Sequence, residues 1–353
     1  MPRVRGLVRI VLHVALALAT LEGVARLDDR LRDGAPILGS HGIDSLFESA
    51  GSGRVGVPDR RFGKWALNSL GYRGDEPVAG RDVVLVFGAS ESFGLYESPG
   101  REYPAQLQSL LDARRPGRYS VVNAAVPGMR VGHVDLLERA IARVKPRYVV
   151  IYAGPASYIG VERGYCALSS RPLAPRPPAG PALRLQGKLQ TLVKAHVPES
   201  VQTWVREVEL GRQSAARDPV DAVPASTIRA FGDDVECARQ AALRAGATPV
   251  VMTHATYFGD VLSERDRPQM VAWRKFYPSL SGNGLLDLER RANLELRRIG
   301  QRPGTVFVDV ASRVPPGREH FADFVHFTDA GASIVAQALA ASILQEGRGA
   351  AVR

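Results

Sequence analysis

Ser90 lies just after an apolar run, and an Asp-x-x-His pair lies far downstream of Ser90. The run Val83–Phe87 ends three residues before Ser90, and Asp323 precedes His326 by three residues. A serine hydroxyl becomes a strong nucleophile only when a base takes its proton, and that base needs an acid to orient it. Ser90, His326 and Asp323 are therefore predicted to form a catalytic triad of nucleophile, base and orienting acid.

The sequence around these groups alternates between apolar runs and amphipathic segments. Continuous apolar runs are typical of strands buried on both faces, and helical spacing of apolar residues is typical of the helices between them. The alternation predicts an α/β fold, a three-layer α/β/α sandwich with a parallel sheet, whose sites lie at the carboxyl ends of the strands. The predicted strands are 83–87, 119–123, 148–152, 249–252 and 306–310, and the predicted helices are 103–114, 134–144, 228–245, 284–299 and 329–344.

The alternation stops between about residues 160 and 224. Residues 171–181 are crowded with prolines, which excludes regular helix and central strand, and residues 183–210 return to helical spacing. The segment is predicted to be an insertion after the third strand. Its position places it over the rim of the site, either as a lid or membrane-facing cap or as a decoration without a role.

The N-terminus has the pattern of a secretory signal or a short signal-anchor. Arg3, Arg5 and Arg9 precede an apolar stretch at 10–21. The stretch is shorter than the ~20 residues of a comfortable span, and Ala-x-Ala sequences in it resemble cleavage sites. Glu22 and Arg26 follow at once, as in a continuing helix, which favours a retained anchor over cleavage. Either interpretation predicts export, with the protein held at the inner membrane facing the periplasm or cell exterior, or secreted.

The predicted organisation has four parts. Residues 1–27 form the signal-anchor or signal peptide, 28–80 a linker and lead-in segment, 81–345 the catalytic domain with its insertion, and 346–353 a tail. A chain of 353 residues that is 45% hydrophobic can bury a large core. The net charge is +10, but the sequence contains no nucleic-acid-binding motif, so no nucleic acid partner is predicted.

The two cysteines do not indicate a metal site. Neither Cys166 nor Cys237 lies in a Cys-x-x-Cys or Cys/His spacing. Export would allow them to form a disulfide, and two unpaired buried thiols are the alternative. No Gly-rich phosphate loop is present, so neither metal nor organic cofactor is predicted.

Four blocks of the sequence resemble the SGNH/GDSL hydrolases, specifically the bacterial kind with an N-terminal membrane segment. The resemblance covers roughly residues 67–344 without the insertion. It implies a flavodoxin-like sheet, an acyl-enzyme on Ser90, and an oxyanion held by the amides of Ser90 and Gly128. The four blocks are Gly88-Ala89-Ser90 in place of Gly-Asp-Ser, Asn123–Gly128 in place of the second block, the final Asp-x-x-His block Asp323–Gly331, and the lead-in Asn68–Gly74 of anchored members.

The third block of the family is the serious departure. Where the family has Gly-x-Asn-Asp, this chain has Gly154-Pro155-Ala156-Ser157, so Ala156 replaces the oxyanion-binding Asn. Removing one such donor typically costs about 10²–10³ in rate. Ser157, His254 and Asn283 are the candidate substitute donors. Ala89 stands where the family has Asp, but that position lies outside the triad.

The predicted function is hydrolysis of an O-acyl ester by an exported, membrane-anchored serine hydrolase. Transfer of the acyl group to a cell-surface polymer or another alcohol is the second interpretation, because anchored relatives modify such polymers. A non-catalytic SGNH-fold binding protein is the third, because Ala156 has taken the place of the Asn.

Overall fold

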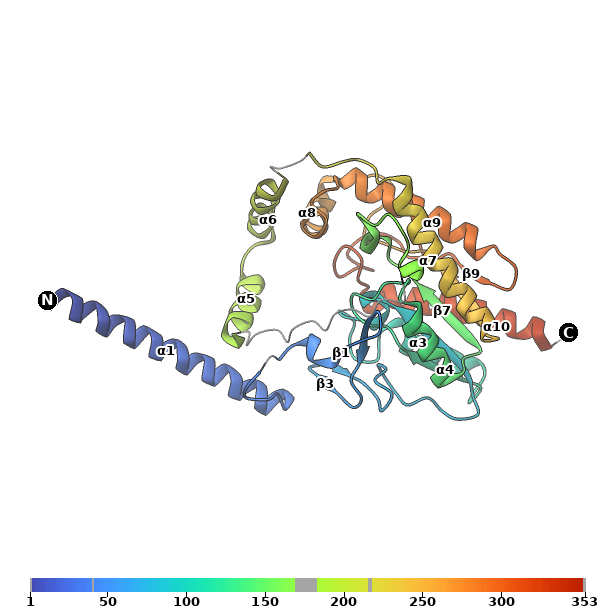
Figure 1. Cartoon of the computed structure of the whole chain (residues 1–353), viewed down its shortest axis with the longest axis horizontal. Coiled ribbons are helices and arrows are strands. Elements are labelled where there is room, and N and C mark those ends of the chain that lie inside the picture. The colour runs from blue at the N-terminus through green and yellow to red at the C-terminus, as the bar shows by residue number, and fades with distance from the viewer. Residues whose placement is uncertain (1, 40, 169–182, 215–217, 352–353) are drawn as a thin grey trace.

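The computed structural model describes residues 2–39, 41–168, 183–214 and 218–351 (Figure 1). Its centre is a five-stranded parallel sheet in the order β6-β5-β7-β8-β9. The proline-rich segment 171–181, predicted to be irregular, lies outside the described residues. The strands are β5 (Asp82–Gly88), β6 (Tyr119–Asn123), β7 (Tyr148–Tyr152), β8 (Thr248–Met252) and β9 (Val306–Val308).

Helices cover both faces of this sheet. Successive side chains of a strand point to opposite faces, so an apolar strand needs a packing partner on each side. Val84, Val86 and Val150 belong to the core on one face, and Leu85 and Ile151 belong to the core on the other. The predicted three-layer α/β/α fold is therefore confirmed. The first face is covered by α3 (Tyr103–Arg114) and α10 (Asp329–Ala351), and the second by α4 (Val134–Val144), α7 (Ala225–Arg244) and α9 (Gly282–Gly300).

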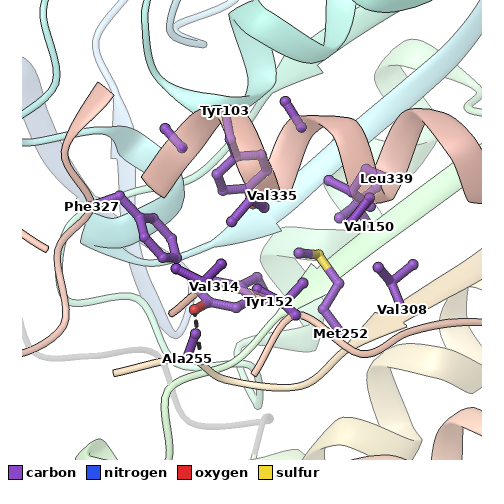
Figure 2. Close-up of a cluster of buried hydrophobic side chains, with 14 of the residues drawn as sticks. Tyr103, Val150, Tyr152, Met252, Ala255, Val308, Val314, Phe327, Val335 and Leu339 are labelled. Carbon is purple, nitrogen blue, oxygen red and sulfur yellow. Dashed lines mark hydrogen bonds between the residues drawn. The ribbon is translucent and has the colours of Figure 1, made fainter. Parts of the chain in front are cut away.

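The core beneath α10 also holds the loop that carries His326. Figure 2 shows Val335 and Leu339 of α10 packed with Tyr103 over the side chains of the central strands. Phe327, the residue after His326, is fully buried, and its ring centroid lies 6.0 Å from that of Tyr152 on β7. Burial of Phe327 thus fixes the neighbouring His326 against the end of the sheet.

Most elements begin and end close to the predicted limits, and α3, α4, β6 and β7 match them. The last strand is shorter than predicted, ending at Val308 instead of Val310. Its end is set by a tight turn, because the Val310 amide donates to the Val308 carbonyl at 3.0 Å and the Val314 amide then donates to the Val310 carbonyl.

The N-terminal helix α1 (Pro2–Asp33) extends beyond the predicted limit of residue 27. The candidate span Val8–Arg32 contains an 18-residue window with a mean hydropathy of 1.7, of which only 6% is buried, so length and composition would allow this helix to cross a membrane. A signal peptide would pass the same test. The helix extends away from the rest of the chain (Figure 1).

Two small hairpins follow α1, where the sequence analysis expects a linker and lead-in. The hairpins pair β1 (Phe47–Ala50) with β2 (Gly53–Gly56) and β3 (Arg61–Phe62) with β4 (Trp65–Ala66). Leu46, Phe47 and Leu67 of this region share a buried cluster with Phe93. These strands are too short to show the apolar pattern by which a core strand is predicted. Through this cluster they pack against the turn that follows β5.

The insertion contains two helices, α5 (Arg184–His196) and α6 (Glu199–Ser214). They divide the predicted helical region 183–210 at Pro198, whose missing N–H cannot continue the hydrogen-bonding of α5. The helix α8 (Arg267–Phe276), which follows β8, packs beside α6.

Cys166 and Cys237 form a disulfide, the first of the two interpretations left open by the sequence. Cys166 lies in a 3₁₀ turn, Tyr165–Leu168, at the start of the insertion, and Cys237 lies in α7. The Asp234 carboxylate accepts the backbone amides of Tyr165 and Cys166 at 2.8 and 2.7 Å. The beginning of the insertion is therefore fastened to α7 both covalently and by hydrogen bonds.

Candidate active site

Ser90 is the first residue of α2 (Ser90–Phe93), a single helical turn that begins where β5 ends. The turn closes with hydrogen bonds from the Phe93 amide to the Ala89 carbonyl and from the Gly94 amide to the Ser90 carbonyl. Gly94 has a φ of 80°, a left-handed conformation that favours glycine. Ser90 is half-buried at the carboxyl edge of the sheet, as predicted from its place after an apolar run.

The turn is held in place through Ser92, which is fully buried. The Tyr103 hydroxyl donates to Ser92 Oγ at 2.7 Å, and Asn123 Nδ2 donates to the Ser92 carbonyl at 2.9 Å. Tyr103 comes from α3 and Asn123 from the end of β6. Two neighbouring elements thus set the orientation of the backbone that carries Ser90.

A buried arginine holds the other end of the turn. Arg73, only 6% exposed, donates to the carbonyls of Phe93 and Gly94 and pairs with Glu102 at 3.1 Å. Trp65 Nε1 donates to the same Gly94 carbonyl at 3.2 Å. These donors satisfy carbonyls at the end of α2 that have no partner within the helix.

His326 and Asp323 lie together in the loop before α10. Asp323 Oδ1 accepts the amides of Val325 and His326 at 3.0 and 2.9 Å, and His326 Nδ1 lies 2.8 Å from Asp323 Oδ2. The backbone bonds fix the carboxylate, which then fixes the imidazole. In the described part of the chain, His326 Nε2 is buried and has no hydrogen-bond partner.

The charges of this pair follow from its surroundings. Burial acts to lower the pKa of His326, but the hydrogen bond that it donates to Asp323 and the negative charge of Glu91 raise it above its usual value. Burial acts to raise the pKa of Asp323, but the bond to His326 and its charge hold it below the usual value. Asp323 therefore stays ionised, and it favours a proton on His326.

The Ser90 hydroxyl donates to Glu91 Oε2 at 3.0 Å. Among the residues described, it makes no hydrogen bond to His326. The two groups nonetheless lie at the same end of the sheet, because Phe327, next to His326, packs on Tyr152, which pairs with Gly88 at the end of β5. Hydrogen bonds between catalytic groups are often long or poorly aligned in a structure without substrate and tighten when substrate binds.

Glu91 is the end of a buried chain of charged groups. Its Oε1 lies 3.4 Å from His254 Nε2, and His254 Nδ1 lies 2.8 Å from Glu289 Oε2. The backbone of His254 is held by Asn293, which accepts its amide at 2.7 Å and donates to its carbonyl. Glu91, His254 and Glu289 are all buried.

The chain of groups carries fixed charges. Burial acts to lower the pKa of His254, but the charge and hydrogen bond of Glu289 and those of Glu91 raise it to about 10. Burial acts to raise the pKa of Glu91, but His254, followed by the charge of His326, lowers it to about 2. An anionic carboxylate paired to an imidazolium therefore lies against the Ser90 hydroxyl at neutral pH.

Sequence reasoning missed Glu91 and Glu289. Glu91 adjoins the predicted nucleophile, and this adjacency was the one available signal. Glu289 lies in α9, 35 residues from His254, and nothing in the spacing links the two. Gly154 makes room for the pair, because a Cβ there would lie 3.3 Å from both Glu91 Oε1 and His254 Nε2.

Within the described ranges, none of the three predicted substitute donors hydrogen-bonds to the Ser90 hydroxyl. Ser157 Oγ donates to the Gly154 carbonyl at 3.3 Å. Both ring nitrogens of His254 face carboxylates. Asn283 lies in the first turn of α9, beside a cavity of about 900 Å³ that His254 also lines. Ala156 packs at the edge of the hydrophobic core.

Gly128 lies in the turn after β6 with a φ of 78°, which only glycine adopts without strain. Across the described residues, the amides of Ser90 and Gly128 donate no hydrogen bond to another protein group. Both predicted oxyanion donors are therefore free to bind a ligand.

No family model matches the sequence, and no curated protein matches it. Solved structures of similar arrangement include a catalytic mutant of the acetylxylan esterase Axe2 from Geobacillus stearothermophilus, at 15% identity and a TM-score of 0.44, covering 76% of this chain and 96% of that one. The psychrotrophic esterase EstA from Pseudoalteromonas sp. is similar at 10% identity and a TM-score of 0.42, over 76% and 99% of the two chains.

A protein named as a lipolytic member of the G-D-S-L family, from Desulfitobacterium hafniense DCB-2, is similar at 10% identity and a TM-score of 0.42. The match covers 74% of this chain and 99% of that one. With TM-scores below 0.5, the family and activity of this chain have to be argued from its own residues.

Proposed function

We propose that this chain is an SGNH/GDSL-type serine hydrolase that cleaves O-acyl esters. Ser90 is the nucleophile, His326 the base, and Asp323 the residue that orients His326. One observation carries the proposal: among the residues that the structure describes, the buried Nε2 of His326 has no hydrogen-bond partner, while its Nδ1 is held by the ionised Asp323. That atom is the one that accepts the serine proton in a triad.

In the proposed reaction, Ser90 Oγ leaves Glu91 and attacks the acyl carbonyl while its proton passes to His326 Nε2. The amides of Ser90 and Gly128 stabilise the oxyanion. The bond from the acyl carbon to the alcohol oxygen then breaks, and the alcohol takes the proton from His326. Water, deprotonated by His326, cleaves the acyl-enzyme, which releases the acid and restores the Ser90 hydroxyl.

We further propose that α1 is a retained signal-anchor, so that the catalytic domain is exported and faces the periplasm or cell exterior. The apolar window Val8–Arg32 supports this, and so do Arg3 and Arg5 before it. An acyl ester is the proposed substrate, and transfer of the acyl group to an alcohol in place of water would use the same acyl-enzyme.

A serine-selective fluorophosphonate probe tests the proposed function. The probe is expected to label the full chain, and mass spectrometry should place the adduct on Ser90. Ser90→Ala should abolish labelling, whereas Ser157→Ala, which removes a hydroxyl bonded only to the Gly154 carbonyl, should not. No labelling of well-folded wild-type protein would contradict the proposal.

Two observations favour a different function, that of a non-catalytic binding protein. The Ser90 hydroxyl is engaged by Glu91, and Ala156 leaves the third-block donor missing. Such a protein would resist the probe, and its Ser90→Ala variant would keep its biological activity. The labelling experiment therefore separates the two functions.

Replacing Glu91 by glutamine is expected to move the acid limb of the kcat/KM profile to lower pH. His326 acts as a base only when neutral, so activity falls as pH drops through its pKa. The negative charge of Glu91 raises the pKa of His326. Removing this charge lowers that pKa, and the loss of activity then occurs at more acidic pH. The measurement is the pH dependence of hydrolysis of an aryl ester.

Glu97→Gln is the matched control for Glu91→Gln. Glu97 is buried, burial raises its own pKa to about 7, and its charge also acts on His326, but more weakly than that of Glu91. We expect a smaller shift for Glu97→Gln. A profile that moves with Glu97→Gln and not with Glu91→Gln would identify Glu97 as the titrating group and contradict the role given to Glu91.

A further inference from the structure

Helix α6 turns its apolar stripe outward. Val201, Trp204, Val205 and Val208 recur at the spacing of one helical face, and all four are exposed, Trp204 to 62%. The opposite face is the one that packs toward α8, where Glu207 pairs with Arg267 at 2.8 Å. A helix at the surface of a globular domain normally presents the reverse arrangement.

Helix α5 repeats this pattern. Leu189, Leu192 and Val193 lie on one side of the helix and are exposed, Leu192 to 57%. Two consecutive helices therefore present apolar side chains to solvent. Exposed apolar patches of this kind mark protein or membrane interaction sites.

The polar contacts of α5 attach it to the last part of α1. The Glu22 carboxylate accepts the amides of Arg184 and Leu185 at 3.1 and 2.9 Å, which satisfies two free donors at the start of α5. Arg184 also lies 3.6 Å from Asp29, and Lys188 pairs with Asp28 at 2.7 Å. These contacts fasten α5 beside the C-terminal half of α1.

A largely apolar groove of about 880 Å³ runs between the two helices. Leu18 contributes from α1, and Leu185, Leu189 and Val193 contribute from α5. The window Val8–Arg32 is about 37 Å long at 1.5 Å per residue, longer than the ~30 Å hydrocarbon core of a bilayer. The final turns of α1, where α5 attaches, therefore reach the interface between hydrocarbon and water.

We propose that α5 and α6 lie in the interface of the membrane that α1 crosses, with their apolar faces against lipid and an acyl chain in the α1–α5 groove. The proposal rests on the anchoring of α1 proposed above. Figure 1 shows α5 and α6 on the side of the body from which α1 projects. We assign lipid to the groove because one of its two walls is α1, the helix proposed to span the bilayer. The insertion then positions the catalytic domain close to the membrane surface.

Trp204 reports directly on this proposal. The full chain is reconstituted in phosphatidylcholine vesicles whose acyl chains carry bromine, which quenches tryptophan by contact. Relative to unbrominated vesicles, wild-type protein in brominated vesicles is expected to lose Trp204 emission. Subtracting the spectrum of Trp204→Phe removes Trp65 and the fully buried Trp273.

Two variants make the result specific. Val205→Glu places a charge on the outward stripe of α6 and should reduce the quenching. Leu294→Glu is the matched control, because Leu294 is 60% exposed on α9 and lies outside the proposed surface. It should leave the quenching unchanged.

The outcomes separate this inference from the proposed anchor. Protein that fails to sediment with vesicles contradicts the anchoring of α1. Protein that sediments while Trp204 remains open to aqueous iodide and insensitive to bromine overturns the lipid contact of α6. A third outcome is that Trp204 is shielded from iodide only at high protein concentration and is not quenched by bromine. This result would assign the surface to a second copy of the chain and would likewise overturn the lipid contact.

Discussion

Ser90→Ala, His326→Ala and the double variant are each expected to lower kcat for ester hydrolysis by about 10⁶-fold. The three losses should be nearly equal because the two residues act on the same proton. Without His326 the Ser90 hydroxyl stays protonated, and without Ser90 the base has no nucleophile to activate. The residual activity would come from substrate binding and the amides of Ser90 and Gly128.

This prediction has a rival in the structure itself, since the Ser90 hydroxyl donates to Glu91 and not to His326. Glu91 is a weak base, because His254 and His326 hold its pKa at about 2 against the opposing effect of burial. A base with so low a pKa takes little of the serine proton at neutral pH. We therefore assign to Glu91 the positioning of Ser90 and the tuning of His326.

Single-turnover kinetics of acyl-enzyme formation provide the measurement, with Ser157→Ala as a serine control that should remain close to wild type. If His326→Ala retains most of the activity while Glu91→Gln loses it, Glu91 is the base and the triad is wrong. If losses from Ser90→Ala and His326→Ala add in the double variant, the two residues act in separate steps.

The second large effect is on stability. Arg73→Met is expected to lower the free energy of unfolding by about 3–5 kcal/mol, the usual cost of breaking a buried ion pair by removing one partner. The substitution leaves Glu102 buried without its cation and removes donors from the carbonyls of Phe93 and Gly94. It should also loosen α2, so that labelling of Ser90 slows in protein that is still folded.

Urea unfolding of the full chain in detergent measures the change. Arg244→Met is the control, because its pair with Glu138 is exposed and such pairs contribute about 0–1 kcal/mol. The double variant Arg73→Met/Glu102→Leu should recover much of the loss, since it removes the unpaired charge. Equal effects of Arg73→Met and Arg244→Met would show that Arg73 does not support the turn.

Much of the sheet could be predicted because buried parallel strands are nearly continuous apolar runs. The runs at 83–87 and 148–152 predicted central strands, and the structure places both inside the sheet with helices over each face. Asp323 and His326 were predicted as a pair because three residues are enough for a carboxylate to reach back to an imidazole. Local chemistry at short range is readable from sequence.

The contacts that could not be predicted join distant segments. Glu91 and Glu289 lie on opposite sides of His254 only after β8 and α9 have packed, and no periodicity records that meeting. Arg73 lies in the lead-in block Asn68–Gly74, which the sequence analysis identifies. Its role in holding α2 depends on the turn after β5 lying beside it, which the sequence does not show. Similarly, the sequence of α6 has the pattern of an ordinary amphipathic helix. That its polar face, and not its apolar stripe, packs toward α8 is known only from the structure.

For a chain exported as proposed above, the Cys166–Cys237 bond makes the stability of the fold depend on the redox state of the compartment that holds it. The crosslink spans 71 residues, and loop-closure theory gives about 4 kcal/mol for a loop of that size. Thiols stay reduced in a bacterial cytosol, so a chain that has not been translocated lacks this contribution. Without the disulfide, the start of its insertion is held to α7 by the hydrogen bonds of Asp234 and by the packing of Tyr165 against the core beneath α7. Under the proposed export, the disulfide would form only after translocation, and the newly made precursor would be the less stable of the two forms.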